Sequence, residues 1–331
     1  MTRSTSLVVS VIIVSFNTRD LLRRCLQTLA DQAGAIPYET IVVDNASKDG
    51  SADMVQTEFP ATKLIRSDVN LGFAAANNRG FEIASGKYVV LLNSDAFLCA
   101  GALPTAVAKM EADPKIGLGG GRLLGSDDSW QPSARMFPSL LNDFLAISGL
   151  ASQYPLSRFF GRSDRTWADP GEPAEVDWVP GAFSIIRREV LDRIGFFDKR
   201  FFLYYEEVDL CQRIQQGGYS IWYWPDVMVV HLGGESSKTV NHLHLTSTGS
   251  QLTLWRMRSG LLYYRKHHGR WGAWQVRALE TLWHRIRSWK NLAAGDQARK
   301  EKAKEAQLLV SLMNKAWMET DGGMHSPTPP W

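Results

Sequence analysis

Short apolar runs alternate with amphipathic segments through the first hundred residues of this chain. Four runs have the character of buried strands: residues 8–15, 40–43, 63–66 and 88–92. The segments between them carry apolar side chains at helical spacing: residues 19–32, 51–59 and 73–85. Strands that are joined by crossover helices predict an α/β fold with a mostly parallel, doubly wound sheet.

The remainder of the chain has a less regular pattern. We expect helices at residues 103–112 and 206–216, and strands at residues 116–124, 131–137, 176–187 and 219–231. A loop rich in Arg, Ser, Asp, Gly and Pro spans residues 150–173. Residues 251–317 read as almost entirely helical, and residues 318–331 as a disordered tail.

Composition limits the class of protein. The 331 residues are 44% hydrophobic and 21% charged, as in an ordinary globular protein, and the net charge of +3 is too small to indicate nucleic acid as a partner. Cys25, Cys99 and Cys211 match neither a zinc site nor a disulfide framework, so we expect free thiols in a reducing compartment. No apolar stretch approaches the roughly 20 residues of a membrane span, which favours a cytoplasmic protein.

Polar residues follow the apolar run at residues 88–92. Asn93, Ser94 and Asp95 stand where the carboxyl ends of strands in open α/β sheets bind ligands. A carboxylate there can hold a hard divalent cation against a diphosphate, because such cations prefer oxygen ligands. The alternative is that Asp95 caps the next turn or helix.

Two other strand ends carry candidate nucleotide contacts. Ser15 and Asn17 follow the first strand, where Asn17 either touches a nucleotide or caps the next helix. Asp44 ends the second strand, where its carboxylate either accepts a hydrogen bond from a base or ribose or forms an Asx turn. A Gly-rich dinucleotide fingerprint and a phosphate-binding P-loop are both missing from the sequence.

Two further segments are rich in polar groups. The stretch NLGFAAANNRG supplies further candidate nucleotide-sugar contacts: Asn70, Gly72, Asn77 and Arg79. The stretch FFLYYEEVDL opens a helix with three acidic residues: Glu206, Glu207 and Asp209. They are candidates for catalysis, although acidic residues in a first helical turn are also favoured by the helix dipole.

These motifs together resemble glycosyltransferase family 2, enzymes of the GT-A fold, and within it the branch that contains bacterial rhamnosyltransferases. The resemblance covers about residues 8–268. The segments that carry it are VSVIIVSFNTRDLLRRCLQTL, IVVDNASKDGS, NLGFAAANNRG, LLNSDAFL, VPGAFSIIRREVLDRIGFFDKRFFLYYEEVDLCQRI and VVHLGGESS.

The resemblance implies roles for particular residues. Asp44 would contact the base, Asp95 would be the last carboxylate of the metal-binding triplet, and His231 would join it as a ligand of Mn²⁺ or Mg²⁺. Glu207 stands where the family usually has an aspartate as general base, and Asn93-Ser94-Asp95 replaces the frequent Asp-x-Asp. These departures leave one carboxylate in the triplet and a base with one extra methylene.

The resemblance also implies an activity. It is the metal-dependent, inverting transfer of a sugar from a nucleotide sugar to a saccharide hydroxyl in bacterial surface polysaccharide synthesis, such as O-antigen or cell wall. The favoured donor is dTDP-L-rhamnose, and a UDP-sugar is the alternative. The acceptor is expected to be a saccharide, probably best presented on a lipid carrier, with Trp178 and Gly181 lining its pocket. A non-catalytic nucleotide-sugar-binding protein docked on a membrane is the alternative from another class.

The expected domain division follows the same resemblance. Residues 1–245 would form the GT-A catalytic domain, with a nucleotide-binding half at 1–100 and an acceptor-binding half at 101–245. Residues 246–317 would form a helical extension in which basic residues and Trp are interleaved. Such a helix suits either an anionic membrane surface, with the protein peripheral on the inner face of the plasma membrane, or ordinary packing on the core.

Overall fold

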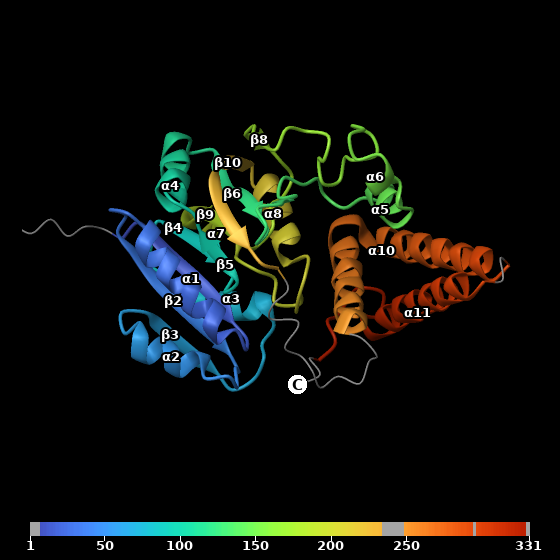
Figure 1. The fold of residues 1–331 in the computed structure, drawn as a ribbon, viewed down its shortest axis with the longest axis horizontal. Helices are drawn as coiled ribbons and strands as arrows, with labels where there is room; N and C mark the ends of the chain where they lie inside the picture. Colours follow the sequence, from blue (N-terminus) through green and yellow to red (C-terminus); the bar gives the residue numbers. More distant parts are fainter. Residues whose placement is uncertain (1–6, 234–247, 294–295, 329–331) are drawn as a thin grey trace, which may run out of the picture.

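The computed structural model describes residues 7–233, 248–293 and 296–328 (Figure 1). Within them, a mixed ten-stranded sheet has the order β3-β2-β1-β4-β9-β6-β10-β5, with β7 beside β6 and β8 beside β10. The strands are β1 Val9–Ser15, β2 Tyr38–Asn45, β3 Lys63–Ser67, β4 Tyr88–Leu92, β5 Ala96–Leu98, β6 Ile116–Leu124, β7 Trp130–Gln131, β8 Ala174–Glu175, β9 Phe183–Arg187 and β10 Ser220–His231.

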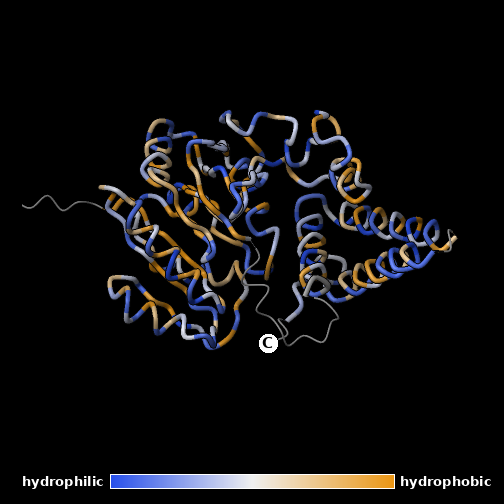
Figure 2. Tube along the Cα trace, viewed as in Figure 1, coloured by the Kyte–Doolittle hydropathy of each residue, from blue (hydrophilic) through white to orange (hydrophobic). Residues whose placement is uncertain are grey.

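The first four strands are parallel, and helices cover both of their faces. Along β1, Val9, Val11 and Ile13 share a core with the helices on one face, whereas Ile12 shares a core with α3 on the other. The helices are α1 Arg19–Gln32, α2 Ser51–Glu58, α3 Phe73–Glu82 and α4 Ala102–Ala112. Hydrophobic residues accordingly follow the strands in Figure 2. The predicted doubly wound α/β sheet is confirmed, and it brings the carboxyl ends of β1, β2 and β4 to one edge.

The second half of the sheet is mixed, because β9 runs antiparallel to both β4 and β6. Three successive glycines of β6 allow close packing: a Cβ at Gly119 would lie 1.9 Å from the Trp224 ring. Strand β10 continues across Pro225, which lies in the irregular stretch between Trp224 and Met228. The predicted pair of strands at 219–231 is therefore a single strand with a bulge.

Two predicted strands are much shorter than expected. The strand at 131–137 is reduced to β7, because Pro132 cannot donate a ladder hydrogen bond. The strand at 176–187 is reduced to β9, and the Pro180-Gly181 turn precedes it. The segments that lost strand character, 132–137 and 176–182, instead run close to the site described below.

The remaining helices are α5 Leu140–Ile147, α6 Leu150–Gln153, α7 Arg188–Ile194, α8 Glu206–Gln216, α10 Thr248–Leu292 and α11 Gln297–Glu319. Helix α10 is kinked at Gly269, where the backbone takes φ +70°. Its first part packs into the main core through residues such as Leu254, Met257 and Leu261. Its second part pairs with α11 to form an arm that projects from the body (Figure 1). No described helix is both long enough and apolar enough to cross a membrane.

The C-terminal boundary of the extension needs correction. The expected tail begins inside α11, and Thr320 beyond the helix is fully buried, with its hydroxyl donating to Ala316 O. Gly323 N donates to Thr320 Oγ1 at 3.0 Å, so the chain turns back on the helix instead of leaving it. The predicted disorder of residues 318–331 is therefore wrong for 318–328. The expected boundary at 245/246 lies outside the described residues.

Candidate functional site

The loops that follow β1, β2 and β4 are tied together by short polar side chains. Thr18 Oγ1 donates to Ser94 Oγ at 2.9 Å and lies 3.1 Å from Ser15 Oγ, and all three side chains are buried. Asn17 receives no ligand-like isolation here: its backbone N–H donates to Ser47 and its Oδ1 accepts from Lys48 N at 2.7 Å. Ser15, Asn17 and Ser94 therefore shape the edge of the sheet and hold its loops in place.

Asp44 occupies the end of β2 with one carboxylate oxygen paired and the other unpaired. Its Oδ2 accepts from Ser47 N at 3.2 Å, whereas its Oδ1 is buried and has no hydrogen-bond partner. Burial raises the pKa of this carboxyl, against the Ser47 hydrogen bonds that lower it. A buried acceptor without a partner is costly, so this oxygen is suited to a donor that arrives with a ligand.

Asp95 and His231 meet beyond the end of β4. Strand β5 pairs antiparallel with the end of β10, which brings His231 opposite Ala96. His231 Nε2 lies 3.5 Å from Asp95 Oδ1 and also 3.5 Å from the Asn93 side-chain amide. Residues 136 positions apart in the chain are thus brought together as the sequence analysis expects of a shared site.

The imidazole of His231 is oriented by Gln131 of β7. Gln131 Nε2 donates to His231 O at 2.9 Å, so its Oε1 is the atom that faces His231 Nδ1, at 3.1 Å. An amide oxygen can only accept, which places the proton on Nδ1 and leaves the Nε2 lone pair toward Asp95. Histidines that bind metals are commonly oriented by such a second hydrogen bond.

The donor set suits a divalent cation that shares its coordination with a ligand. One carboxylate oxygen and one imidazole nitrogen can contact the same cation, and a diphosphate would supply further oxygens. Among the described residues, no group of three or more His, Cys, Asp or Glu side chains is placed to hold a metal unaided. The residues therefore fit a cation bound together with a nucleoside diphosphate better than a closed protein site.

The segment at residues 70–80 is mainly a structural bridge. Asn70 Oδ1 accepts from both Asn45 and Gly72 N, and Asn77 is buried with its amide donating to Phe73 O. Gly72 has φ +78°, and a Cβ there would lie 2.4 Å from Phe202 O. Arg79 is half-buried, and within the described residues no hydrogen bond or ion pair engages its side chain. Of these four, Arg79 is the one with a free charge to offer.

Glu206 and Glu207 open α8 directly after a strained turn. Tyr204 and Tyr205 have φ of +70° and +68°, a region that costs a residue with a side chain about 1–3 kcal/mol. Ser259 of α10 supports this turn by donating to Leu203 O at 2.8 Å. Such strain persists where the surrounding structure requires one geometry, and here it sets the direction of the two carboxylates.

Both carboxylates have a buried Oε2 without a hydrogen-bond partner. Burial, and then the charge of Glu207, raise the pKa of Glu206 well above its usual value. Burial also raises the pKa of Glu207, but backbone hydrogen bonds and the charge of Arg135 oppose that rise. The pair therefore favours a protonated Glu206 beside an ionised Glu207.

Asp209 has a different environment from its two neighbours. It is fully buried and forms ion pairs with Arg213 at 2.9 Å, Lys266 at 2.7 Å and His267 at 2.7 Å. Although burial raises it, the His267 hydrogen bond and these cations hold its pKa below the usual value. All its neighbours are protein groups, so Asp209 joins α8 to α10 and is not the catalytic residue that the sequence analysis expected.

The expected acceptor residues flank the carboxylates. Trp178 donates its indole N–H to Met136 O at 2.9 Å, and the Arg135 guanidinium lies 5.0 Å from the centre of its ring. Gly181 has open space beside it, with Phe73 the nearest group at 3.6 Å. Trp178 is thus held by the protein, with part of its surface left exposed.

The sequence analysis missed Gln131 and Arg135. Both lie in the segment expected to be a buried strand, where Gln131, Ser133 and Arg135 alternate with other residues. Polar side chains on alternate positions of a buried strand need partners, and this pattern was the available signal. Their partners, His231 and Glu207, are too distant in the chain to be inferred from it.

The fold and the site define a glycosyltransferase of the GT-A type. A solved structure described as "Mannosyltransferase PcManGT from Pyrobaculum calidifontis in complex with GDP-Man and Mn2+" has a TM-score of 0.52 at 19% identity, over 94% of this chain and 86% of that chain. "Crystal structure of GalNAc-T7 with UDP, GalNAc and Mn2+" has a TM-score of 0.53 at 15% identity, over 99% and 59%. At these identities the likeness concerns the fold alone.

The family model "Glycosyl transferase family 2" matches residues 10–195, and the chain belongs to this family. It is 28% identical over 256 residues to "N-acetylglucosaminyl-diphospho-decaprenol L-rhamnosyltransferase" of Mycobacterium tuberculosis, covering 72% of this chain and 81% of that protein. It is 26% identical over 265 residues to "Rhamnosyltransferase WbbL" of Escherichia coli, covering 76% and 95%. The resemblance to a rhamnosyltransferase-like member of family 2 is confirmed.

Proposed function

We propose that this chain moves a sugar, with inversion, from a nucleotide sugar to a hydroxyl of a lipid-linked saccharide in bacterial surface polysaccharide synthesis. The observation that carries the proposal is the approach of His231 Nε2 to Asp95 Oδ1, with Gln131 presenting the imidazole lone pair. A strand-end carboxylate alone is compatible with a cap, but a carboxylate and an oriented imidazole together are suited to a cation.

The nucleotide would bind at the edge formed by β1, β2 and β4. The buried, unpartnered Oδ1 of Asp44 would accept the ring N–H of a thymine or uracil base. dTDP-L-rhamnose is the preferred donor, because two of the relatives named above are rhamnosyltransferases. A UDP-sugar offers the same ring N–H and is the alternative donor.

Asp95 and His231 would hold a divalent cation, Mn²⁺ or Mg²⁺, against the diphosphate. A bound cation would stabilise the negative charge that develops on the departing nucleoside diphosphate. The half-buried guanidinium of Arg79 is a further candidate for contact with the diphosphate. Asn93 would help to keep the imidazole in place through its side-chain amide.

Glu207 would act as the general base. It would take the proton of the acceptor hydroxyl as that oxygen attacks the anomeric carbon, while the bond from this carbon to the diphosphate oxygen breaks and the electron pair leaves with the nucleotide. One displacement of this kind inverts the anomeric centre. Protonated Glu206 would keep a second negative charge away from the attacking oxygen and can donate a hydrogen bond to the acceptor.

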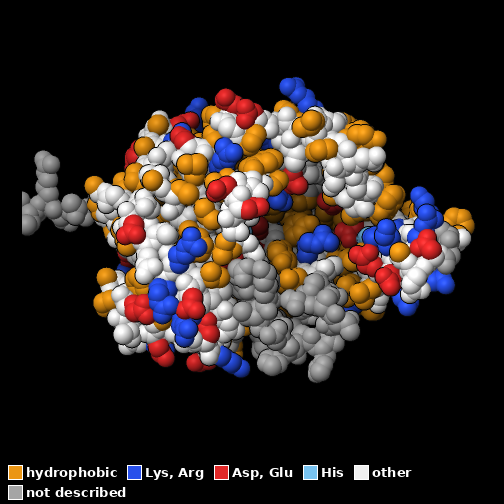
Figure 3. Space-filling model, viewed as in Figure 1, with side chains coloured by type: hydrophobic (Ala, Val, Ile, Leu, Met, Phe, Trp, Pro, Cys, Tyr) orange, Lys and Arg blue, Asp and Glu red, His pale blue; other side chains and the backbone are white. Residues whose placement is uncertain are grey.

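The second part of α10 suits a membrane surface. Six large apolar side chains form an outward stripe, defined as Trp271, Trp274, Leu282, Ile286, Trp289 and Leu292. Trp271 and Trp289 are 75% and 73% exposed, and the stripe runs about 30 Å along the helix. Exposed Arg270, Arg285 and Lys290 flank it, and Figure 3 shows basic and hydrophobic side chains together on this arm. An anionic membrane surface carrying the acceptor matches that combination.

Donor binding and turnover with purified protein test the proposal. We expect dTDP or UDP with Mn²⁺ to raise the thermal unfolding midpoint, and expect Asp95→Ala to lose the part of this shift that depends on Mn²⁺. Transfer to a lipid-linked acceptor should fall by at least about a hundredfold in the same variant. Full activity of Asp95→Ala would contradict the metal site, and binding of donor without turnover of any acceptor would favour the non-catalytic alternative.

A further inference from the structure

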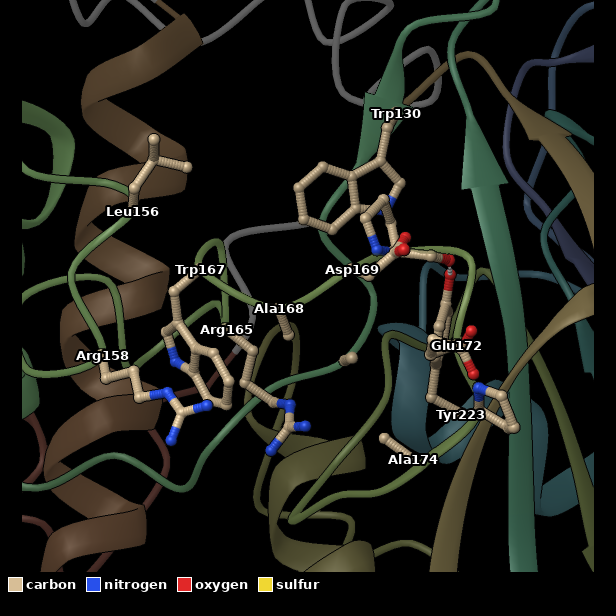
Figure 4. Close-up of a pocket in the computed structure, with 13 residues that line it drawn as sticks. Trp130, Leu156, Arg158, Arg165, Trp167, Ala168, Asp169, Glu172, Ala174 and Tyr223 are labelled. Carbon is tan, nitrogen blue, oxygen red and sulfur yellow. Dashed lines mark hydrogen bonds between the residues drawn. The ribbon is translucent and has the colours of Figure 1, made fainter.

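A cavity lies beside the candidate site and is not used by the proposed chemistry so far. It has a volume of about 340 Å³ and is closed mainly by the loop at residues 156–174 together with β7 and β10 (Figure 4). Aromatic, basic and acidic side chains line it in separate places: Trp130, Trp167 and Tyr223; Arg158 and Arg165; Asp169 and Glu172. Such a mixture is typical of a ligand site and not of a packing defect.

The basic part of the cavity has no counter-ion. The guanidinium groups of Arg158 and Arg165 lie 4.9 Å and 5.3 Å from the centre of the same Trp167 ring. Neither forms an ion pair in the part of the chain that the structure describes, and Arg165 Nε is buried without a hydrogen-bond partner. Two cations held close together without a carboxylate are suited to an anion with several oxygens, such as a phosphate or diphosphate.

The other part of the cavity has the chemistry of a sugar site. Trp130 and Tyr223 present aromatic surface, and the Asp169 and Glu172 carboxylates lie near them in Figure 4. Trp130 Nε1 is buried without a partner, so it can donate to a sugar oxygen. Tyr223 donates its hydroxyl to Pro170 O at 2.7 Å, which fixes the loop against β10.

The mouth of the cavity is apolar. Leu156 lines it and is 83% exposed, and Phe159 and Tyr154 of the same loop are also exposed. In Figure 4, Arg158, Trp167 and Arg165 lie between Leu156 and the group formed by Trp130 and Tyr223. The order along the cavity is therefore apolar, cationic, and then aromatic with carboxylates.

The cavity is connected to the candidate active site through one short segment. Trp130 lines the cavity, and its neighbour Gln131 bonds to His231. Four residues further on, Arg135 lies close enough to Glu207 to lower its pKa, and it also forms an ion pair with Asp164 of the cavity loop at 3.4 Å. A ligand in the cavity would therefore lie beside the residues assigned to catalysis.

We propose that this cavity is the acceptor subsite for a glycosyl diphosphate joined to an apolar chain. Arg158 and Arg165 bind the diphosphate, Trp130 and Tyr223 hold the saccharide, and the apolar chain leaves past Leu156. The assignment rests on the proposed function, because it names the acceptor of that same reaction. It accounts for the two unpaired guanidinium groups, which a neutral saccharide would leave without a partner.

The test compares two acceptors that differ only in charge. One is N-acetylglucosamine joined through a diphosphate to an undecyl chain, and the other is the undecyl glycoside without phosphate. In the double variant Arg158→Gln, Arg165→Gln, we expect KM for the diphosphate acceptor to rise at least about tenfold and KM for the glycoside to stay unchanged. Arg162→Gln, in the same loop but outside the cavity lining, is the matched control.

Direct binding separates this inference from the proposed function. The diphosphate probe should quench tryptophan fluorescence of the wild type, and the double variant should need at least about tenfold more probe. Inorganic pyrophosphate should compete weakly, because it lacks the sugar and the chain. Equal probe affinity in wild type and double variant would overturn the subsite, even with donor binding intact. Loss of donor binding in the wild type would instead contradict the proposed function.

Discussion

Glu206 and Glu207 are adjacent in the chain, yet their environments give them different protonation. Both have a buried oxygen without a partner, but the backbone hydrogen bonds and the charge of Arg135 favour ionised Glu207. A family aspartate would be one methylene shorter at position 207. The strained turn at Tyr204 and Tyr205 is the local feature that sets the reach of the longer side chain.

Glu207→Gln should reduce kcat by about 10²–10⁴-fold, because an amide cannot accept the proton of the acceptor hydroxyl. Donor binding should be unchanged, as measured by the nucleotide-dependent shift in thermal unfolding. In the wild type, kcat should rise with pH through the raised pKa of Glu207, since the base must be ionised. Glu206→Gln is the matched control and should keep this rising limb; its loss in Glu206→Gln would exchange the two roles.

Gln131→Met should weaken binding of Mn²⁺ by about 10–100-fold, because the imidazole of His231 would lose the acceptor that holds its Nδ1 proton. Isothermal titration of Mn²⁺ into protein saturated with dTDP measures this without reference to turnover. Gln153→Met, an exposed change in α6, is the control. Equal Mn²⁺ affinity in both variants would remove Gln131 from the site.

Between helices α8 and α10, Asp209 is the main polar link. Its carboxylate takes three basic partners, of which Lys266 and His267 come from α10. The helical extension therefore does more than add a surface: it holds the first turn of α8, where the two catalytic candidates lie. Ser259, which donates to Leu203 O, supports the same turn from one helical level earlier.

Asp209→Asn should lower the free energy of unfolding by about 3–5 kcal/mol, because it leaves buried cations uncompensated. The pKa of Asp209 is lowered in the folded state, so its contribution is present above the unfolded pKa of 3.8 and is lost as the pH falls through the folded value. Urea titrations at pH 7 measure the effect. A stable Asp209→Asn protein without activity would instead return Asp209 to the catalytic group.

Glu280 in the second part of α10 has the opposite linkage. Burial raises its pKa from 4.5 to about 7, so the folded protein loses stability as the pH rises from about 4.5 to 7. Glu280→Gln should remove this penalty and stabilise the protein at pH 8 by about 3 kcal/mol, from 1.36 kcal/mol per pKa unit. The gain should vanish near pH 4. A gain of equal size at both pH values would contradict the assignment to ionisation.

On the scale of the whole molecule, the nucleotide edge, the cavity and the arm follow one another across the structure. Figure 3 shows the molecule hollowed between the body and the α10–α11 arm. Helix α5 packs on α10, with Phe144 against Trp283 at 5.7 Å, so the cavity loop that follows α6 is anchored to the arm. A membrane-bound acceptor can thus reach the site while the outward stripe of α10 rests on the membrane.

Replacing Trp271, Trp274 and Trp289 by Gln should reduce binding to vesicles of phosphatidylglycerol and phosphatidylcholine by at least about tenfold, because the exposed apolar area of the stripe is largely removed. Flotation measures the bound fraction, and high salt should weaken wild-type binding through the flanking Arg and Lys. Leu308→Gln with Met318→Gln, exposed changes on α11, is the control. Unchanged flotation of the triple variant would exclude the stripe as the membrane surface.

Much of the fold could be predicted from the sequence because its signals are local. Periodicity alone placed α1 at residues 19–32, β6 at 116–124 and α8 at 206–216, with the bounds that the structure has. Strand-end Asp44 and Asp95 were accessible for the same reason, since topology brings the ends of parallel strands to one edge. The 131–137 strand failed because Pro132 removes a ladder donor, an effect that the apolar pattern conceals.

The amino-acid order by itself determined the doubly wound half of the sheet and its polar strand ends, because each depends on residues within one or two turns of chain. Only the tertiary structure decided which polar groups became partners. It paired Gln131 with His231, gave Asp209 to Lys266 and His267, and left Glu206 and Glu207 with unpaired oxygens. Such pairings join residues far apart in sequence, and they form because a buried polar group without a partner costs more than the contact that satisfies it.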